Sequence, residues 1–438
     1  MKSVALYTLG CKVNQYETDA MMELFRQGGY EIRSFNEPAD IYVINTCAVT
    51  NVADRKSRQM LHRAKKKNKE SLVVAVGCYV QAAKEILEED VYVDLIIGNN
   101  KKKDIVEIVN HYLEVNSGED NIINIRHASQ YEALRISQTS EHTRAYIKIQ
   151  DGCNQFCSYC IIPYTRGRVR SRAAKDVINE VQNLVSNGYK EIVLTGIHIS
   201  SYGIDFQNKE YNFILLIEHL SRIDGLGRIR LGSLEPRIIT EAFVKRLVAI
   251  PQICPHFHLS LQSGCDETLK RMNRRYDTKD YEMRCNILRK YFDNPAISTD
   301  VIVGFPGETD KEFEMTKAYL KQIGFAGIHV FAYSKRAGTK AAELKEQVAA
   351  ASKRERSREL LEIAKKLKEN YFRQYLNKTV EVLIEETIEL DGIIYNMGHS
   401  REYIKVVLGY APGRLNTVVS GRIKHKIHED LVFCESIH

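Results

Sequence analysis

The sequence predicts an α/β protein in three parts: an N-terminal open parallel α/β domain, a central partial (β/α)6 barrel and a small C-terminal β-barrel. Residues 1–130 and 140–370 alternate short apolar runs with amphipathic stretches, the pattern of strand–helix–strand units. Residues 371–438 instead have short β-rich runs divided by turn residues, which is typical of a small β-barrel.

The N-terminal part predicts a parallel sheet because its apolar runs lack polar alternation, as strands buried on both faces do. These strands are expected at Ser3–Leu9, Asp40–Ile44 and Leu72–Val76. Helices are expected at Gln15–Gly28 and Asp54–Lys67. Residues 114–140 are polar and without clear periodicity, and we interpret them as a linker.

A cysteine lies at the end of each predicted N-terminal strand: Cys11, Cys47 and Cys78. The carboxyl ends of neighbouring parallel strands share one edge of a sheet, so these cysteines can converge although they are far apart in sequence. We expect a three-cysteine iron–sulfur site with one open iron. The alternative is three small apolar fillers, since cysteine is a frequent core residue.

A second set, Cys153, Cys157 and Cys160, forms a C-x3-C-x2-C loop directly after a predicted strand. Thiolates suit iron–sulfur clusters or zinc. Zinc normally takes four ligands, and no fourth cysteine or nearby histidine follows. A four-iron cluster held by three cysteines keeps one iron open for another ligand. The alternative is a group of buried or regulatory thiols. The other cysteines share no metal spacing and are expected to be structural: Cys254, Cys265, Cys285 and Cys434.

The central part predicts six strands, whose carboxyl ends would carry the chemistry of a partial barrel. They are expected at Ala145–Ile149, Glu191–Thr195, Arg228–Gly232, Phe257–Leu261, Ile297–Ile302 and Gly327–Ala332. Helices are expected at Ala174–Asn187, Phe313–Ile323 and Ser352–Glu369. The C-terminal barrel is expected to be antiparallel, with strands at Thr379–Ile384, Gly392–Asn396, Tyr403–Leu408, Thr417–Lys424 and Leu431–Cys434. We interpret His198, His256 and His258 as ordinary polar or core residues.

Basic residues gather in three places that could contact phosphates. Arg166, Arg168, Arg170 and Arg172 follow the C-x3-C-x2-C loop, Arg55 and Arg58 lie on a predicted helix, and the tail carries Arg401, Lys405, Arg422, Lys424 and Lys426. For the four arginines after the loop we favour a substrate-facing role. For the helix and the tail, a solvated surface is the alternative.

Composition narrows the class of protein. The net charge of +7 is a mild basic excess, and ten cysteines in spaced sets indicate metal use in a reducing compartment rather than disulfides. No apolar run approaches the length of a membrane span, and the first residues do not resemble a signal peptide. We therefore expect a cytoplasmic protein without a membrane partner.

The C-x3-C-x2-C loop resembles that of the radical S-adenosylmethionine superfamily, whose open iron chelates the cofactor. The resemblance implies cofactor contacts at the residue before the last cysteine and at four strand ends: Tyr159, Thr195, Gly196, Glu235, Gln262, Ser263, Val303 and Gly304. The turn Thr195-Gly196-Ile197-His198 departs from the usual Gly-Gly-Glu type.

The whole chain resembles the methylthiotransferases through residues 8–17 (TLGCKVNQYE), 45–47, 76–78 and 152–160. The resemblance implies a C-terminal tRNA-binding TRAM domain, two [4Fe-4S] clusters and two molecules of S-adenosylmethionine. It also implies the anticodon stem-loop of tRNA as partner, a sulfur donor, and an electron donor such as a flavodoxin or ferredoxin. Residues 10–17 are most similar to the branch that acts on threonylcarbamoyl-adenosine.

Other functions stay open on the sequence. A methylthiotransferase for isopentenyl-adenosine tRNA or for a ribosomal protein would share the clusters and the barrel. A radical enzyme of small molecules would not need residues 371–438, and a non-catalytic RNA-binding sensor would not need the cofactor motifs around Thr195 and Gly304.

Overall fold

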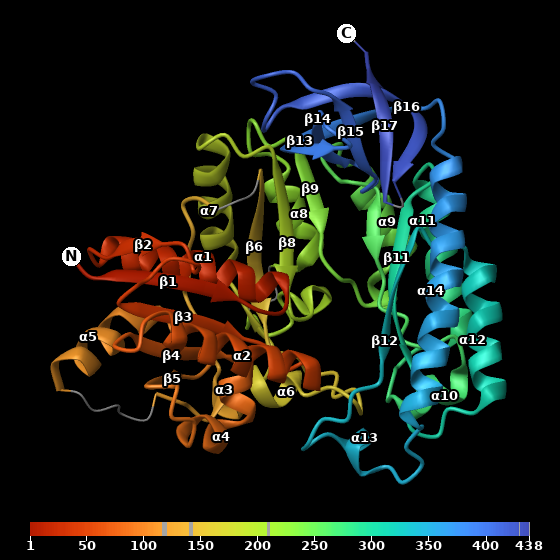
Figure 1. Cartoon of the computed structure of the whole chain (residues 1–438). Helices are drawn as coiled ribbons and strands as arrows, with labels where there is room; N and C mark the ends of the chain where they lie inside the picture. Colours follow the sequence, from red (N-terminus) through yellow and green to blue (C-terminus); the bar gives the residue numbers. More distant parts are fainter. Residues whose placement is uncertain (116–120, 140–142, 208–210, 429, 438) are drawn as a thin grey trace.

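The computed structural model describes residues 1–115, 121–139, 143–207, 211–428 and 430–437. Figure 1 shows three bodies: an N-terminal sheet with its helices, a central strand–helix region, and a C-terminal β-barrel lying over one end of that region. Among the described residues, no helix is long and apolar enough to cross a membrane.

The N-terminal body is a parallel sheet in the order β2-β1-β3-β4-β5. Its strands are β1 (Ser3–Thr8), β2 (Glu31–Arg33), β3 (Ile41–Thr46), β4 (Leu72–Gly77) and β5 (Leu95–Ile97). Its helices are α1 (Lys12–Gln27), α2 (Asn51–Lys67), α3 (Cys78–Ala82), α4 (Lys84–Glu88) and α5 (Ile105–Val115). Every residue of β3 and β4 is buried, as the continuous apolar runs predict.

The central region has the predicted six parallel strands in chain order, divided between two sheets. One sheet runs β7-β6-β8-β9 and the other β10-β11-β12. The strands are β6 (Arg144–Asp151), β7 (Arg170–Ser171), β8 (Glu191–Gly196), β9 (Arg228–Leu231), β10 (His256–His258), β11 (Ala296–Val303) and β12 (Gly327–Ala332). The helices are α6 (Ile162–Thr165), α7 (Ala174–Ser186), α8 (Phe213–Leu220), α9 (Glu241–Val248), α10 (Asp266–Arg271), α11 (Thr278–Tyr291), α12 (Asp310–Ile323), α13 (Lys340–Glu343) and α14 (Ala350–Arg373). Figure 1 shows α14 running beside β12 towards the C-terminal barrel.

The fourth barrel strand differs from the prediction of Phe257–Leu261. Only His256–His258 is regular strand, and single bridges at Leu234–Leu259 and Gln262–Val301 continue the pairing. Gln262 has φ +75°, a left-handed conformation that ends regular strand geometry. This interruption falls where the two sheets of the central region meet.

The predicted linker of residues 114–140 begins inside helix α5, which ends at Val115, and its described residues 121–139 are packed into the molecule. It has no α-helix or strand there, yet Ile125, Leu134 and Ile136 are buried. The Leu134 carbonyl accepts a hydrogen bond of 2.7 Å from the Tyr16 hydroxyl of α1. The segment therefore connects the N-terminal body to the central core instead of spanning solvent.

The C-terminal barrel is closed in the order β13-β14-β15-β17-β16. Its strands are β13 (Thr379–Leu390), β14 (Ile393–Ser400), β15 (Lys405–Gly409), β16 (Val418–His428) and β17 (Leu431–Ser436). Four of its five neighbouring pairs are antiparallel, as predicted, whereas β15 and β17 pair in parallel. Strand directions cannot alternate all the way around a closed ring of five strands, so one parallel pair is required.

Two buried arginines of β9 join the central region to the C-terminal barrel. Arg228 donates hydrogen bonds to the carbonyls of His399 (3.2 Å) and Glu381 (2.9 Å). Arg230 donates to the carbonyls of Arg401 (3.0 Å) and Ser400 (3.2 Å). The two arginines are only 2% and 1% exposed, so these bonds fix the barrel on the central region.

Candidate functional site

The first cysteine set lies at the carboxyl edge of the N-terminal sheet. Cys11 follows β1 and precedes α1, Cys47 follows β3, and Cys78 opens α3 after β4. A Cβ atom on Gly10 would lie 2.9 Å from Cys47 Sγ, so the β1 and β3 ends are in contact. Burial first, and then the neighbouring Cys78 and Cys11, raise the pKa of Cys47 to about 12. The three thiols therefore lie close together at this edge of the sheet, as a shared ligand set requires.

Arg166 is fully buried between this set and the central region. Its Nε donates a hydrogen bond to Cys78 Sγ at 3.2 Å. Its two Nη atoms donate to the carboxylate of Glu17 at 2.8 and 3.0 Å. Nη1 also lies 3.2 Å from both carboxylate oxygens of Asp151, the last residue of β6. One guanidinium thus connects the first cysteine set to the strand that leads into the second.

Glu17 is the centre of a buried charge cluster, which we call the Glu17 cluster: Glu17, Lys102, Lys148, Asp151 and Arg166. The ammonium groups of Lys102 and Lys148 lie 2.7 and 2.6 Å from its carboxylate. Burial would raise the pKa of Glu17, but the three cations outweigh burial and hold the pKa well below its ordinary value. Lys148 and Asp151 are polar interruptions in a buried strand, the one sequence signal for this cluster.

The second cysteine set lies on the loop between β6 and α6. Arg274 donates a hydrogen bond from Nη1 to Cys157 Sγ at 3.2 Å. Burial raises the pKa of Cys153 to about 11 and that of Cys160 to about 12, each with a smaller contribution from Cys157. Cationic donors to sulfur stabilise thiolates, so the surroundings of both sets fit bound iron–sulfur clusters. No sequence signal indicates this contact, because Arg274 lies 117 residues from Cys157.

Gly152 lets the second loop leave β6 in close contact with the chain that returns after α6. It has φ +70°, and a Cβ there would lie 1.8 Å from the Arg168 carbonyl oxygen. We expect Gly152→Ala to lower the stability by at least about 3 kcal/mol and to reduce the iron bound after reconstitution.

Gly324, at the end of α12, provides the matched control for this substitution. Its φ is +69°, but no atom lies within 4 Å of an added Cβ. Gly324→Ala should therefore cost only about 1 kcal/mol, the conformational penalty alone. The denaturation midpoint and the iron content of both variants check the prediction. Equal effects would show that the contact with Arg168 is unimportant.

The residues predicted to hold a cofactor lie at the carboxyl ends of strands, on the side where the second cysteine loop follows β6. Thr195 and Gly196 end β8, Glu235 follows β9, Gln262 and Ser263 follow β10, and Val303 and Gly304 lie at the end of β11. Tyr159 packs its ring edge-on to Phe305 at 6.4 Å, next to Gly304. The Gly304 amide donates to Glu308 at 3.0 Å. Tyr159 therefore lies beside the end of β11, and the other predicted residues lie at the ends of their own strands.

The expectation that four arginines after the loop face the substrate is wrong for three of them. Arg166 and Arg170 are buried and interact with Asp151, at 3.2 and 3.8 Å. Arg172 is buried and pairs with Glu180 at 2.5 Å. Their charges are used in internal ion pairs, and only Arg168 is exposed, with its guanidinium 4.4 Å from the centre of the Phe156 ring.

The other predicted RNA contacts lie in different settings. Arg401 donates hydrogen bonds to the carbonyls of Pro251 and Ile253, so its role is at least partly to hold the two barrels together. Lys405 is half-buried, whereas Arg422 is exposed on β16. Lys424 and Lys426 pair with Glu435 (2.8 Å) and Glu369 (2.9 Å). On α2, Arg55 is exposed, while Arg58 donates to the Tyr79 hydroxyl at 2.5 Å.

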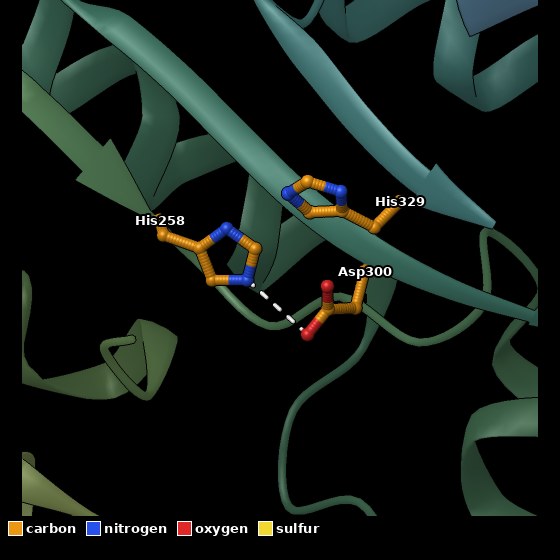
Figure 2. A group of neighbouring side chains, drawn as sticks. All are labelled: His258, Asp300 and His329. Carbon is orange, nitrogen blue, oxygen red and sulfur yellow. Dashed lines mark ion pairs between the residues drawn. The ribbon is translucent and has the colours of Figure 1, made fainter. Parts of the chain in front are cut away.

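Figure 2 shows a group that the sequence analysis did not find, on neighbouring strands β10, β11 and β12. His258 Nε2 lies 3.2 Å from the Asp300 carboxylate, and the ring of His329 lies nearby. One face of β11 packs into the core through Ile297, Val301 and Val303. Ser298 and Asp300 alternate with these residues along the strand. Asp300 and the two histidines therefore lie on the opposite, inner face of this sheet.

Known proteins resemble this chain along most of its length. Residues 3–98 match the uncharacterized protein family UPF0004, and residues 147–320 match the radical SAM superfamily. The chain is 41% identical over 425 residues to the threonylcarbamoyladenosine tRNA methylthiotransferase MtaB of Bacillus subtilis (strain 168), covering 97% of this chain and 94% of that protein. It is 36% identical over 392 residues to the tRNA-2-methylthio-N(6)-dimethylallyladenosine synthase of Clostridium novyi (strain NT), covering 88% and 86%.

Solved structures show that the fold is shared more widely. The radical S-adenosylmethionine methyltransferase TsrM from Kitasatospora setae matches with a TM-score of 0.56 at 14% identity, over 76% of this chain and 73% of that one.

Proposed function

Because the chain belongs to the radical S-adenosylmethionine methylthiotransferase family, we propose that it transfers a methylthio group to C2 of N6-threonylcarbamoyladenosine next to the anticodon of tRNA. The observation that carries the proposal is the connection between two three-cysteine sets. Arg166 contacts Cys78 of the first set and Asp151, two residues before Cys153 of the second. A methylthiotransferase needs two cluster sites held at a constant separation, and this buried contact supports such an arrangement.

Each cysteine set would hold one [4Fe-4S] cluster. Cys153, Cys157 and Cys160 would hold the cluster that binds S-adenosylmethionine, and Cys11, Cys47 and Cys78 the one that carries sulfur. Burial raises the pKa of Cys47 and Cys160 to about 12, so these thiols stay protonated at neutral pH until iron displaces the proton. When bound, the clusters and cofactor supply the radical chemistry that an unactivated adenine C–H bond requires.

The chain's own part is to bind, orient and exclude water. The strand-end residues would surround the cofactor: Tyr159, Thr195, Gly196, Glu235, Gln262, Ser263, Val303 and Gly304. Residues 1–130 would form the domain of the sulfur-carrying cluster, and 140–370 the radical barrel. An adenine in an unstacked anticodon loop can enter a protein pocket, unlike a base inside a helix.

We further propose that residues 371–438 form a TRAM domain that binds the anticodon stem-loop. The exposed Arg422 supports this role, and the exposed Arg55 and Arg168 extend the basic surface onto the other parts. The reaction also requires a sulfur donor and an electron donor, such as a flavodoxin or ferredoxin. We propose a cytoplasmic location, where tRNA is modified.

Nucleoside mass spectrometry tests the function. The reconstituted protein is incubated anaerobically with S-adenosylmethionine, sulfide, a reductant and tRNA bearing threonylcarbamoyl-adenosine. We expect a methylthio derivative of that nucleoside. Matched tRNA bearing isopentenyl-adenosine should yield little or none. Product from the isopentenyl tRNA alone would assign the chain to the other substrate, and cofactor cleavage without either product would reject tRNA methylthiolation.

A further inference from the structure

Lys12, the residue after Cys11 and the first residue of α1, carries a charge without an anionic partner. Within the part of the chain that the structure describes, its ammonium has neither a hydrogen bond nor an ion pair. Its Nζ lies 5.8 Å from the centre of the Tyr146 ring of β6. Lys12 is exposed, and partial desolvation beside the barrel, with smaller contributions from Arg144 and Arg230, lowers the pKa of its ammonium. Lys12 therefore extends from the start of α1 to β6 of the central barrel and remains open to solvent.

Three carboxylates in this part of the barrel already have partners, which are arginines for Glu191 and Glu385 and an imidazole for Asp300. These pairs are Glu191 with Arg230 (2.7 Å), Glu385 with Arg144 (3.2 Å) and, as Figure 2 shows, Asp300 with His258 (3.2 Å). The Glu191 carboxylate also lies 3.6 Å from the Arg228 guanidinium, and the Glu385 carboxylate lies 3.0 Å from the His399 ring. Glu191 and Glu385 therefore already have cationic partners, and the exposed ammonium of Lys12 is available to an anionic ligand.

The proposed substrate carries such an anion in a suitable place. The threonine part of the threonylcarbamoyl group ends in a carboxylate, which is ionised at neutral pH. C2 and N6 of adenine flank N1 on the same edge of the base. If C2 of the base faces Cys11, the substituent on N6 therefore points towards residues beside that cysteine. Lys12 is the next residue in the chain.

We propose that Lys12 binds the carboxylate of the threonylcarbamoyl group and thereby helps to select this modified adenosine. The inference rests on the proposed function and names the residue that recognises the substrate's charge. It replaces the buried Arg166, Arg170 and Arg172, which have no free charge to offer. An isopentenyl group has no charge and would leave the ammonium of Lys12 unpaired.

The experiment combines a change in the protein with a change in the RNA. Two anticodon stem-loops are compared, identical except that one carries the threonyl carboxylate and the other its neutral carboxamide. Binding to the cluster-loaded protein is measured by anaerobic fluorescence anisotropy. We expect the wild type to prefer the carboxylate by roughly ten- to a hundredfold, the range of a hydrogen-bonded charge. Lys12→Met should bring the preference close to one, and Lys12→Arg should keep most of it.

Lys56→Met, on the exposed side of α2 in the same body, is the matched control for removing one positive charge. It should change the affinity for both stem-loops by the same factor. The iron content of every variant is measured as well, since Lys12 adjoins Cys11.

Two results would overturn the inference. The inference fails if the wild type binds the carboxylate and carboxamide stem-loops with equal affinity, whatever the variants show. A Lys12→Met protein that binds both RNAs more weakly by one factor would show that Lys12 contacts phosphate instead. Neither result affects the proposed function, which fails only if the wild type forms no methylthio product on threonylcarbamoyl-adenosine tRNA.

Discussion

The Cys11→Ala variant should lose methylthio transfer completely while it still cleaves S-adenosylmethionine reductively. Cys11 lies at the end of β1, in the set that we assign to the sulfur-carrying cluster. The second set, on the loop after β6, and the strand ends around it are untouched by the substitution. Anaerobic assays that measure 5′-deoxyadenosine and methylthio nucleoside in the same sample separate the two activities.

Two further cysteine variants complete this test. Cys157→Ala should lose both activities, because its thiol belongs to the set that would hold the cofactor-binding cluster. Cys434→Ala, which removes a buried thiol of the distant C-terminal barrel, should keep both. Loss of cofactor cleavage in Cys11→Ala would count against the division of roles between the two sets.

Arg166→Met should lower the free energy of unfolding by about 3–5 kcal/mol, because it removes one of the cations that offset the two buried carboxylates of Glu17 and Asp151. Arg166 makes hydrogen bonds with Glu17 at 2.8 and 3.0 Å and with Asp151 at 3.2 Å, all within the Glu17 cluster. The denaturation midpoint of the cluster-loaded protein measures the effect.

Arg168→Met is the natural comparison for this variant, since Arg168 lies two residues away and is exposed. Its effect should stay within about 0.5 kcal/mol. Combining Arg166→Met with Glu17→Gln should restore part of the lost stability, because the two residues are directly paired. Equal effects of the two arginine variants would mean that the Glu17 cluster does not stabilise the fold.

The parallel strands, and the position of the cysteines after strand ends, could be predicted because their signals are local. Strands buried on both faces appear as uninterrupted apolar runs, and β3 and β4 are two of them. The three-residue strand β2 and the equally short β5 were not predicted, since a run of that length has no measurable period. In the N-terminal sheet the clear signals therefore came from the six-residue strands β1, β3 and β4.

The roles of the arginines could not be predicted, because a charge in the sequence does not reveal its partner. Arg166 and Glu17 are 149 residues apart, and their pairing depends on how the N-terminal body packs on the barrel. The packing of residues 121–139 was missed for a related reason. Their few apolar side chains, Leu134 and Ile136, have no periodic arrangement but become buried against the central core.

The bonds from β9 to the C-terminal barrel have a consequence for how the chain folds during synthesis. Arg228 is made 171 residues before His399, whose carbonyl accepts one of its hydrogen bonds. At typical translation rates of about 5–20 residues per second, the two arginines of β9 are synthesised roughly ten seconds or longer before the backbone carbonyls that accept their hydrogen bonds. The nascent radical barrel is therefore incomplete until the last domain leaves the ribosome. A chain truncated after α14 would keep the ion pairs of both arginines with Glu191 but would lack their carbonyl acceptors permanently, so it would report a folding defect along with any loss of RNA binding.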